Sequence, residues 1–476
     1  MSVLDEFDLY LKLNCITTDS ASNNNAMARE LESRLEELGI IWPCKERHLP
    51  CITHVINIAV DEFIKLIKTS ANAEDTANSG GIDLAQLLAD IRTIAIHIRS
   101  SPQHWEQFKK VCDHVGVKSL KILLDVPTRW NSTHRMMERV IYLHKAIDRY
   151  VLDNTGDLTI ITKKEWELVE LLCAFLWPFK HCTDALEATR KPEVDRVFWA
   201  YNRMFNEIDD FKATLERRQA RRQPWSGVLL TALEGMSAKL RKYYKRTESP
   251  SVYVDAMVLH PRMKTAIFEG NDWDEGDADK YCAEVKARYL EGYAHLPVNA
   301  TCPLPASTPA IGSKRTADEM EDSDDDEYDQ FRQLFPVAEL DEFDKWMSAP
   351  RVDVKLGLSL WRANHMRYPR LARMMRDQCA VPPSGSGVER VFSIAGRVAT
   401  WQRNQLSPKS ICRIMMYKNF MDRKGRMLEV SVESVENCYD DLSEVLHESA
   451  EEEHVMVKTL EEWRKNWNAG MLKNYH

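Results

Sequence analysis

The apolar positions of the chain predict strand-like segments near the N-terminus, followed by long helices. Residues 11–18 form a short apolar run rich in branched side chains, which is typical of a strand. A polar turn that begins at Asp19 follows, and apolar residues at helical spacing then predict a helix over residues 26–38, with Gly39 as its stop. Residues 48–57 predict a further strand that runs into a helix.

Most of the remaining chain has helical periodicity. From residue 55 to about residue 293 the apolar spacing predicts mainly helices, most clearly over residues 82–100 and 164–185. Residues 381–387 contain too much proline and glycine for a helix, and helical spacing resumes at Val388. Glu389 is therefore expected in the first turn of a helix, where the helix dipole favours an acid whether or not it has a chemical role.

Composition indicates a globular chain with two or three domains. The chain has 476 residues, of which 44% are hydrophobic, and no apolar run reaches the ~18 residues that a membrane span needs. Its start lacks the basic region of a signal peptide, and its odd number of cysteines, 11, is typical of reduced thiols in a cytosolic or nuclear compartment. The formal net charge of −9 still permits local basic faces, because part of it comes from an acidic segment within residues 296–329 that is expected to be disordered.

A set of residues between 361 and 406 resembles the C-terminal signature of hAT-superfamily transposases. The matching residues are Trp361, Tyr368, Pro369, Leu371, Met374, Arg376, Asp377, Pro382, Ser384, Glu389, Arg390, Phe392, Ser393, Arg403 and Leu406. The resemblance implies that Glu389 is the third acid of an Asp-Asp-Glu triad on an RNase H-like core. It also implies that residues 361–420 contain the dimer contacts, for which Trp361, Leu371, Met374 and Phe392 are the candidates.

Two N-terminal motifs extend this resemblance. Residues 18–23, TDSASN, are similar to the second-strand motif of the family, whose Asp is the middle acid of the triad and here is Asp19. The alternative is that Asp19 only caps the following turn or helix. Cys51 and His54 match the family's C-x-x-H motif, which implies that His54 lies near the site, whereas a zinc site is disfavoured because the paired Cys and His knuckles are missing. If the triad were complete, Asp19 and Glu389 would bind Mg²⁺ or Mn²⁺, which are hard cations that prefer carboxylate oxygens.

Candidate DNA contacts come from one motif and two basic runs. Residues 128–132, TRWNS, resemble a hAT signature whose Arg-Trp pair, here Arg129 and Trp130, faces DNA; the alternative is a helix start with Trp130 in the core. The basic runs supply Arg217 and Arg218, and Lys242 and Arg246, which either follow phosphates or form solvated helix faces.

The resemblance implies an α/β fold with a large all-α insertion. It consists of an incomplete RNase H-like core interrupted by a helical domain, with a C-terminal helical dimerisation region. The expected divisions are a partial core at residues 1–60, the helical insertion at 61–295, a disordered acidic linker at 296–335, the dimerisation region with the end of the core at 336–422, and a charged helical tail at 423–476.

Two functions remain open from the sequence. Complete hAT transposases have a BED-type zinc finger and the first triad Asp before the strand that matches residues 11–18, and the chain shows no counterpart. We therefore expect a nuclear, transposase-derived protein that binds DNA and forms homodimers or higher homo-oligomers, without catalysis and without contact with membranes. The alternative is a fragment of an active cut-and-paste DNA transposase, and only that alternative requires Mg²⁺ or Mn²⁺.

Overall fold

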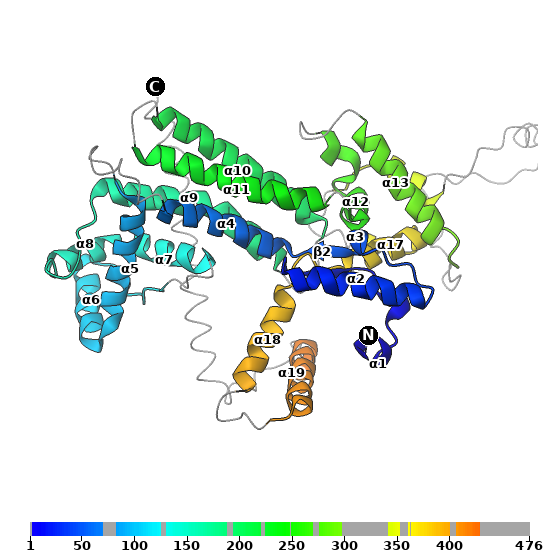
Figure 1. Ribbon diagram of the computed structural model, residues 1–476, viewed down its shortest axis with the longest axis horizontal. Coiled ribbons are helices and arrows are strands. Elements are labelled where there is room, and N and C mark those ends of the chain that lie inside the picture. Colours follow the sequence, from blue (N-terminus) through cyan, green and yellow to red (C-terminus); the bar gives the residue numbers. More distant parts are fainter. Residues whose placement is uncertain are drawn as a thin grey trace, which may run out of the picture.

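The computed structural model describes residues 2–69, 82–124, 130–187, 194–219, 224–247, 249–269, 276–297, 341–352, 360–361, 363–399 and 406–428 (Figure 1). The elements, in chain order, are α1 (Ser2–Glu6), η1 (Tyr10–Lys12), β1 (Ile16–Thr18), α2 (Ser22–Glu37), α3 (Cys44–Arg47), β2 (His48–Pro50), α4 (Ile52–Thr69), α5 (Leu84–Ser100), α6 (Pro102–Val115), α7 (Trp130–Tyr142), α8 (His144–Leu152), α9 (Lys163–Leu186), α10 (Arg196–Gln219), α11 (Pro224–Tyr244), η3 (Lys245–Thr247), α12 (Ser251–Val258), η4 (Lys264–Glu269), α13 (Asp277–Gly292), α15 (Glu342–Ser348), α17 (Pro369–Cys379), α18 (Ser386–Val398) and α19 (Pro408–Leu428). In this part of the chain no helix is both long and apolar enough to span a membrane.

Among the described residues, the strands form one two-stranded parallel sheet. Ile16 pairs with His48, and Thr18 pairs with Pro50. The predicted strand over residues 11–18 is therefore too long: its first residues form η1, and Leu11 is 88% exposed. The strand to helix transition predicted for residues 48–57 is confirmed by β2 and α4. Beyond these two strands, the described residues form no further strand of the expected RNase H-like core.

A bundle of long helices forms the body of the molecule. Helices α4, α9, α10 and α11 run alongside one another, as the long axis of Figure 1 shows. Phe175 of α9 connects three of them, because its ring lies 5.1 Å from that of Phe63 in α4 and 4.3 Å from that of Phe211 in α10. Gly235 lets α11 approach α4 closely: a Cβ at this position would lie 2.4 Å from Leu66 Cδ1.

Two of the predicted helices are confirmed, and a third begins earlier than predicted. Helix α5 matches the prediction for residues 82–100, and α9 matches that for residues 164–185. Helix α2 begins at Ser22, earlier than the predicted residue 26, because the asparagines at 23–25 already belong to its first turns. The predicted boundary between residues 60 and 61 falls inside α4. Most of the predicted linker and most of the charged tail, residues 298–340 and 429–476, lie outside the described residues.

Helices α15 and α17 pack against α12, η4 and α13. Trp361 donates its indole N–H to the carbonyl oxygen of Leu259 at 3.0 Å, and its ring lies 4.4 Å from that of Trp346. Lys264 is 4% exposed and donates its ammonium group to the carbonyl oxygen of Trp346 at 2.6 Å. This cation satisfies a carbonyl at the C-terminal end of α15, where the helix dipole also favours positive charge.

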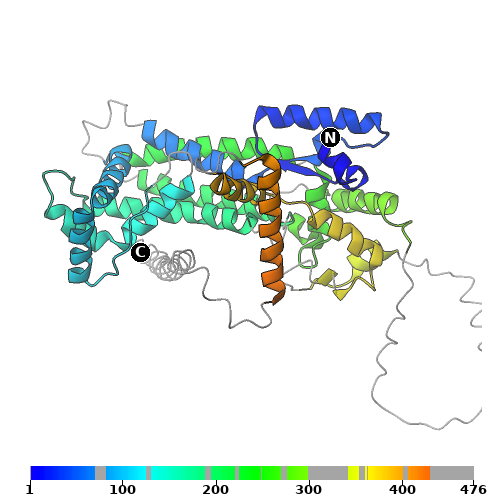
Figure 2. The same cartoon turned by 90° about the horizontal axis from the view of Figure 1, so that it is seen from below.

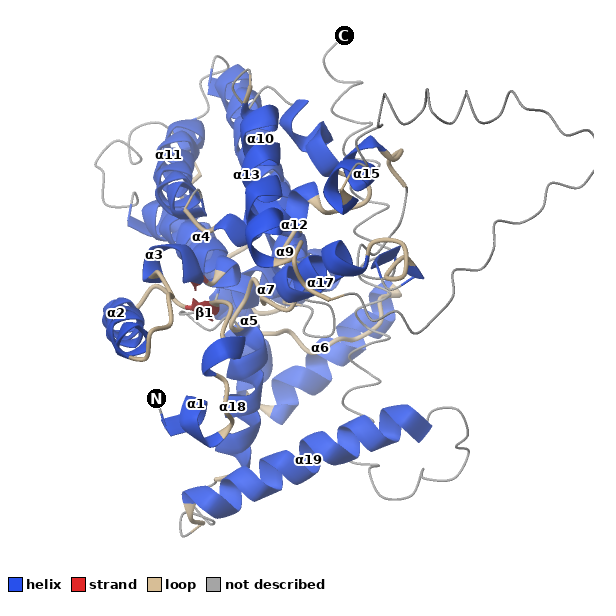
Figure 3. Ribbon diagram, turned by 90° about the vertical axis from the view of Figure 1, so that its right-hand side faces the viewer, coloured by secondary structure: helices blue, strands red, loops and turns tan. Residues whose placement is uncertain are grey.

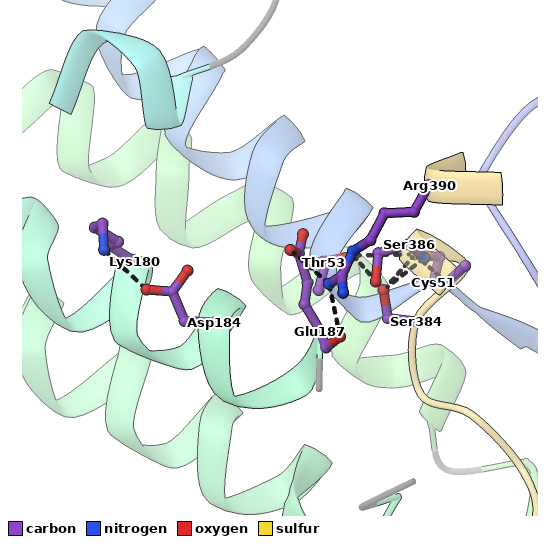
Figure 4. Close-up of polar contacts among 9 residues, drawn as sticks. Cys51, Thr53, Lys180, Asp184, Glu187, Ser384, Ser386 and Arg390 are labelled. Carbon is purple, nitrogen blue, oxygen red and sulfur yellow. Dashed lines mark hydrogen bonds and ion pairs between the residues drawn. The ribbon is translucent and has the colours of Figure 1, made fainter. Parts of the chain in front are cut away.

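The segment before α18 is bound to the junction between β2 and α4, and we call this contact the clasp (Figure 4). The Thr53 and Ser384 hydroxyl groups lie 2.7 Å apart and are both buried, although the residues are 331 positions apart. Ser384 Oγ also accepts the Ser386 backbone N–H at 3.1 Å, and Cys51 Sγ accepts the Gly385 backbone N–H at 3.2 Å.

Backbone carbonyls of the two prolines complete the clasp. The carbonyl oxygen of Pro383 accepts the Ile52 backbone N–H at 3.0 Å, and that of Pro382 accepts the Thr17 hydroxyl at 2.6 Å. Proline has no N–H to satisfy, so a Pro-Pro pair can offer carbonyls to a neighbouring segment without leaving its own donors buried. The clasp therefore fixes the start of α18 beside the sheet.

Helices α18 and α19 extend away from the body (Figure 1), and the view from that side shows them in front of the other helices (Figure 2). Figure 3 shows α19 running apart from the helices of the body, beyond α18. Arg390 of α18 contacts the end of α9, where its guanidinium donates to the carbonyl oxygen of Glu187 at 2.9 Å. The base of α18 is thus held, while much of its surface and that of α19 is exposed.

One prediction concerns Asp255, which connects α12 to α13 and α17. Its side chain is 1% exposed and accepts hydrogen bonds from Arg288 Nε at 2.9 Å and Gln378 Nε2 at 3.1 Å. Burial raises the pKa of Asp255 from 3.8 to about 6 and outweighs the lowering by Arg288. Because the folded-state pKa is the higher one, the stability linked to this proton is present below pH 3.8 and lost as the pH rises to about 6.

Relative to Asp255→Asn, the wild-type free energy of unfolding should therefore fall by about 2–3 kcal/mol between these pH values. Chemical denaturation across this range measures it, with the exposed Asp113→Asn as control. A difference between wild type and Asp255→Asn that does not change with pH would contradict the assignment.

A second prediction concerns Ser384. Replacing Ser384 by alanine removes the partner of the Thr53 hydroxyl and of the Ser386 N–H, so the chain should lose about 1–3 kcal/mol of stability. Ser393→Ala, at an exposed position on α18, should change stability by less than about 0.5 kcal/mol. Equal, small effects of both substitutions in denaturant titrations would mean that the clasp does not form.

Candidate functional site

Asp19 follows β1 directly and is held by its own turn. Its Oδ1 accepts the Ala21 backbone N–H at 3.0 Å and the Asn24 side-chain amide at 2.6 Å. An aspartate that stabilises the turn before a helix makes such contacts. They fit the alternative that Asp19 caps the following turn or helix. The side chain nevertheless lies at the carboxyl end of a parallel strand, the edge at which open α/β sheets place their ligands.

His54 lies beside the Asp19 turn. Its Nε2 is 3.1 Å from the hydroxyl group of Ser20, the residue that follows Asp19. Cys51 faces a different neighbour, because its sulfur contacts Thr53, Ser384 and Gly385 in the clasp. The two residues of the motif therefore link the Asp19 turn and the segment before α18 to one junction between strand and helix.

Glu389 lies in the first turn of α18, as predicted, and is exposed. Its neighbour Arg390 points toward Glu187 at the end of α9, with 3.6 Å between Nη2 and Oε2 (Figure 4). Burial raises the pKa of Glu187, Arg390 opposes this rise, and the negative charges of Asp184 and Glu389 add to it. The negative charge of Glu389 thus acts on an acidic helix end that Arg390 partly neutralises.

Asp19 and Glu389 are the two acids that would hold the implied Mg²⁺ or Mn²⁺. Oδ1 of Asp19 is already engaged by two local donors. Within the described ranges, no three His, Cys, Asp or Glu side chains are placed to hold a metal ion together. The clasp does bring the chain segments of the two acids to the same end of the sheet.

The structure corrects the prediction that the Trp130 ring contacts DNA. Trp130 begins α7 and is 2% exposed, with its ring 6.3 Å from that of His134. A ring enclosed in the core has no face on which a base could stack, so the alternative interpretation, a helix start with Trp130 in the core, applies. Arg129 lies outside the described residues.

The predicted basic residues lie on or directly after the two long helices α10 and α11. Arg217, Lys242 and Arg246 are exposed, whereas the side chain of Arg218 lies outside the described part. The tyrosines interleaved with the second run are not available for stacking: Tyr243 is 8% exposed, and the Tyr244 ring packs 5.1 Å from that of Tyr201. This region can therefore offer charge, but not aromatic faces, to a ligand.

The predicted dimer contacts divide into buried and exposed residues. Trp361, Leu371 and Met374 are at most 2% exposed and belong to the core of the chain itself, which corrects their assignment as dimer contacts. They are buried because α17 and the segment before it pack against α12 and α15. Phe392 is 70% exposed and remains a candidate.

Exposed apolar side chains gather on the two projecting helices, and we call them the α18–α19 patch. It consists of Val388, Val391, Phe392, Ile414, Met416, Tyr417, Phe420 and Met421, each at least 40% exposed. Spacings of three and four residues place the α18 members on one helix face, and Met416, Tyr417, Phe420 and Met421 on one face of α19. The predicted dimer region, residues 361–420, includes four of the five α19 members, although none of them was named as a candidate; the repeated apolar residues between 411 and 421 were the signal.

Two family models match the chain. The "ZBED1 RNase-like helical domain" matches residues 49–175, and the "hAT family C-terminal dimerisation region" matches residues 342–421. The second match includes every residue of the α18–α19 patch.

Curated relatives agree with these matches. A Talaromyces stipitatus protein named as the transcriptional regulator tpeD is 25% identical over 443 residues, which cover 87% of this chain and 46% of that protein. A Zea mays protein named as an AC transposase is 24% identical over 441 residues, covering 89% of this chain and 51% of that protein. The BED zinc finger protein DAYSLEEPER of Arabidopsis thaliana is 26% identical over 310 residues, covering 64% of this chain and 42% of that protein.

The chain thus spans about half the length of the relatives that it matches over most of its own length. The motifs at Asp19, His54 and Glu389, the two family models and these relatives all indicate one origin. The chain is therefore similar to hAT transposases, and its residues 342–421 match the C-terminal dimerisation region of that family.

Proposed function

We propose that the chain acts in the nucleus as a dimerising, nucleic-acid-binding protein of transposase origin. The observation on which this proposal rests is the α18–α19 patch, which lies within the matched dimerisation region. Large apolar side chains gathered on one surface are typical of a protein interface. Since a twofold axis brings the same surface of two copies together, a second copy of the chain can cover the patch.

Nucleic-acid binding is supported by the placement of basic side chains. Arg217 lies near the end of α10, and Lys242 and Arg246 follow along α11 and η3. All three are exposed, and charge contacts of this kind act on the phosphate backbone rather than on bases. Relatives named as an AC transposase and as BED zinc finger proteins fit a nucleic-acid partner.

We also propose that this chain by itself does not cleave DNA. Asp19 and Glu389 supply two of the three acids that two-metal chemistry on an RNase H-like core uses, and Asp19 is held in its turn by Ala21 and Asn24. The second candidate is phosphodiester cleavage by a longer protein of which this chain is a piece. It is favoured by the clasp, which brings the chain segments of both acids to one end of the sheet.

The dimer interface can be tested with Phe392→Ser combined with Phe420→Ser. Burying a phenylalanine stabilises an interface by about 1.5–3 kcal/mol, so the double substitution should weaken dimerisation at least about a hundredfold. Sedimentation velocity of the full chain over a range of concentrations measures this change.

The matched control is Leu152→Ser combined with Ile160→Ser, because these apolar side chains are similarly exposed but lie far from α18 and α19 in the sequence. A wild-type chain that stays monomeric at all concentrations would refute the dimer. Equal weakening by both pairs of substitutions would place the interface elsewhere.

Catalysis can be tested with a labelled duplex of transposon-end sequence in the presence of Mg²⁺ or Mn²⁺. We expect no nicking and no hairpin formation by the wild-type chain. Glu389→Gln is the control: cleavage by the wild type that disappears in this variant would overturn the proposal and establish Glu389 as a catalytic residue.

A further inference from the structure

A pocket of about 370 Å³ opens beside the carboxyl ends of β1 and β2. Its walls come from α2, α3, β2 and the turn after α11, elements that meet at one end of the body in Figure 1. Asp19 and Ser20 form one edge, and His48 of β2 lies in the wall. This volume is within the range of about 300–1,000 Å³ that ligand sites have in proteins.

Three basic side chains from distant parts of the sequence meet at this pocket. They are Arg29 of α2, Lys45 of α3 and Arg246 of η3. All three are exposed, and no ion pair joins any of them to a carboxylate elsewhere in the described chain. Because helices and a short turn fix their backbones, the three positive charges stay close together at a cost in mutual repulsion.

The acidic side chains in the pocket lining do not balance the three positive charges. Asp19 is the acid in the lining, and its Oδ1 already accepts the bonds of the Asp19 turn. The pKa of His48 is lowered by burial and then by the charge of Arg246, so the field of this arginine reaches into the pocket wall. Arg246 itself lies over the Tyr243 ring, 5.4 Å from its centroid, which holds the guanidinium in place.

The basic surface continues beyond the pocket along the end of α11. Arg241, Lys242 and Lys245 are exposed and lead up to Arg246. A small anion would use only the pocket, whereas a polymer with repeated negative charges would use the pocket and this run together. The continuous charge therefore favours a nucleic-acid backbone over a free phosphate ion.

We propose that Arg29, Lys45 and Arg246 bind a backbone phosphate of nucleic acid in this pocket, beside the Asp19 turn. The inference rests on the proposed nucleic-acid binding and names the site that would perform it. Ser20 and Asn25 in the lining can donate hydrogen bonds to phosphate oxygens next to the three cations.

The experiment measures binding of the full chain to a fluorescein-labelled DNA duplex by anisotropy at several NaCl concentrations. The pocket variant combines Arg29→Gln, Lys45→Gln and Arg246→Gln. The control variant combines Lys65→Gln, Lys68→Gln and Lys118→Gln, which removes the same charge from exposed lysines outside the pocket. Circular dichroism confirms that each variant is folded.

We expect the pocket variant to bind at least about tenfold more weakly than the control, with a salt slope shallower by roughly one, since each neutralised phosphate contributes about 0.9. In the wild-type chain, DNA should also slow the alkylation of Cys44, which lies in the lining, relative to Cys282 on α13. This second readout requires no substitution.

Three other results would overturn the inference. Equal binding by the pocket and control variants, with Cys44 unprotected, would refute the pocket while leaving nucleic-acid binding intact. A wild-type chain that does not bind DNA would refute both. Inorganic phosphate that displaces the duplex better than chloride at equal ionic strength would show that the pocket selects a free anion.

Discussion

The arrangement of this protein depends on the contact between two hydroxyl groups that are distant in the sequence. Thr53 and Ser384 are buried together, and the surrounding backbone bonds from Pro382, Pro383 and Gly385 fix the chain on both sides of them. Buried polar groups stabilise a fold only when they are paired, and here each hydroxyl is the partner of the other. The long helical insertion and the C-terminal helices can share one sheet because this contact closes the chain.

The closure has a direct consequence for function. It places α18 at a defined point beside the sheet, with Arg390 against the end of α9 and the apolar side chains of α18 pointing away from the body. It also brings the Glu389 segment to the end of the sheet that the Asp19 turn occupies. One contact thus organises both the proposed dimer surface and the segments of the two proposed acids, Asp19 and Glu389. Asp255 and Lys264 attach the other C-terminal helices to the insertion.

Local patterns predicted the elements well, and they failed where burial depended on distant packing. The apolar periodicity of α5 and α9 was enough to locate them, because each helix presents its own apolar face. The motifs themselves could not show which side chains are buried, because burial depends on helices far away in the sequence. The buried side chains are Trp130, Trp361, Leu371 and Met374.

The same limit applies to the pocket. Arg29 and Lys45 stood out in no local motif, and only the fold brings them to Arg246. The strand over residues 11–18 was predicted too long, because composition could not distinguish η1 from a strand. In contrast, the placement of Glu389 followed from a local signal, the break in helical pattern before Ser386.

A double-mutant cycle between Thr53→Val and Ser384→Ala tests the central contact most directly. If the hydroxyls are partners, the two substitutions are not additive, and the coupling free energy from denaturant unfolding should be about 1 kcal/mol or more. Additive effects, with a coupling near zero, would contradict the closure of the chain at this point.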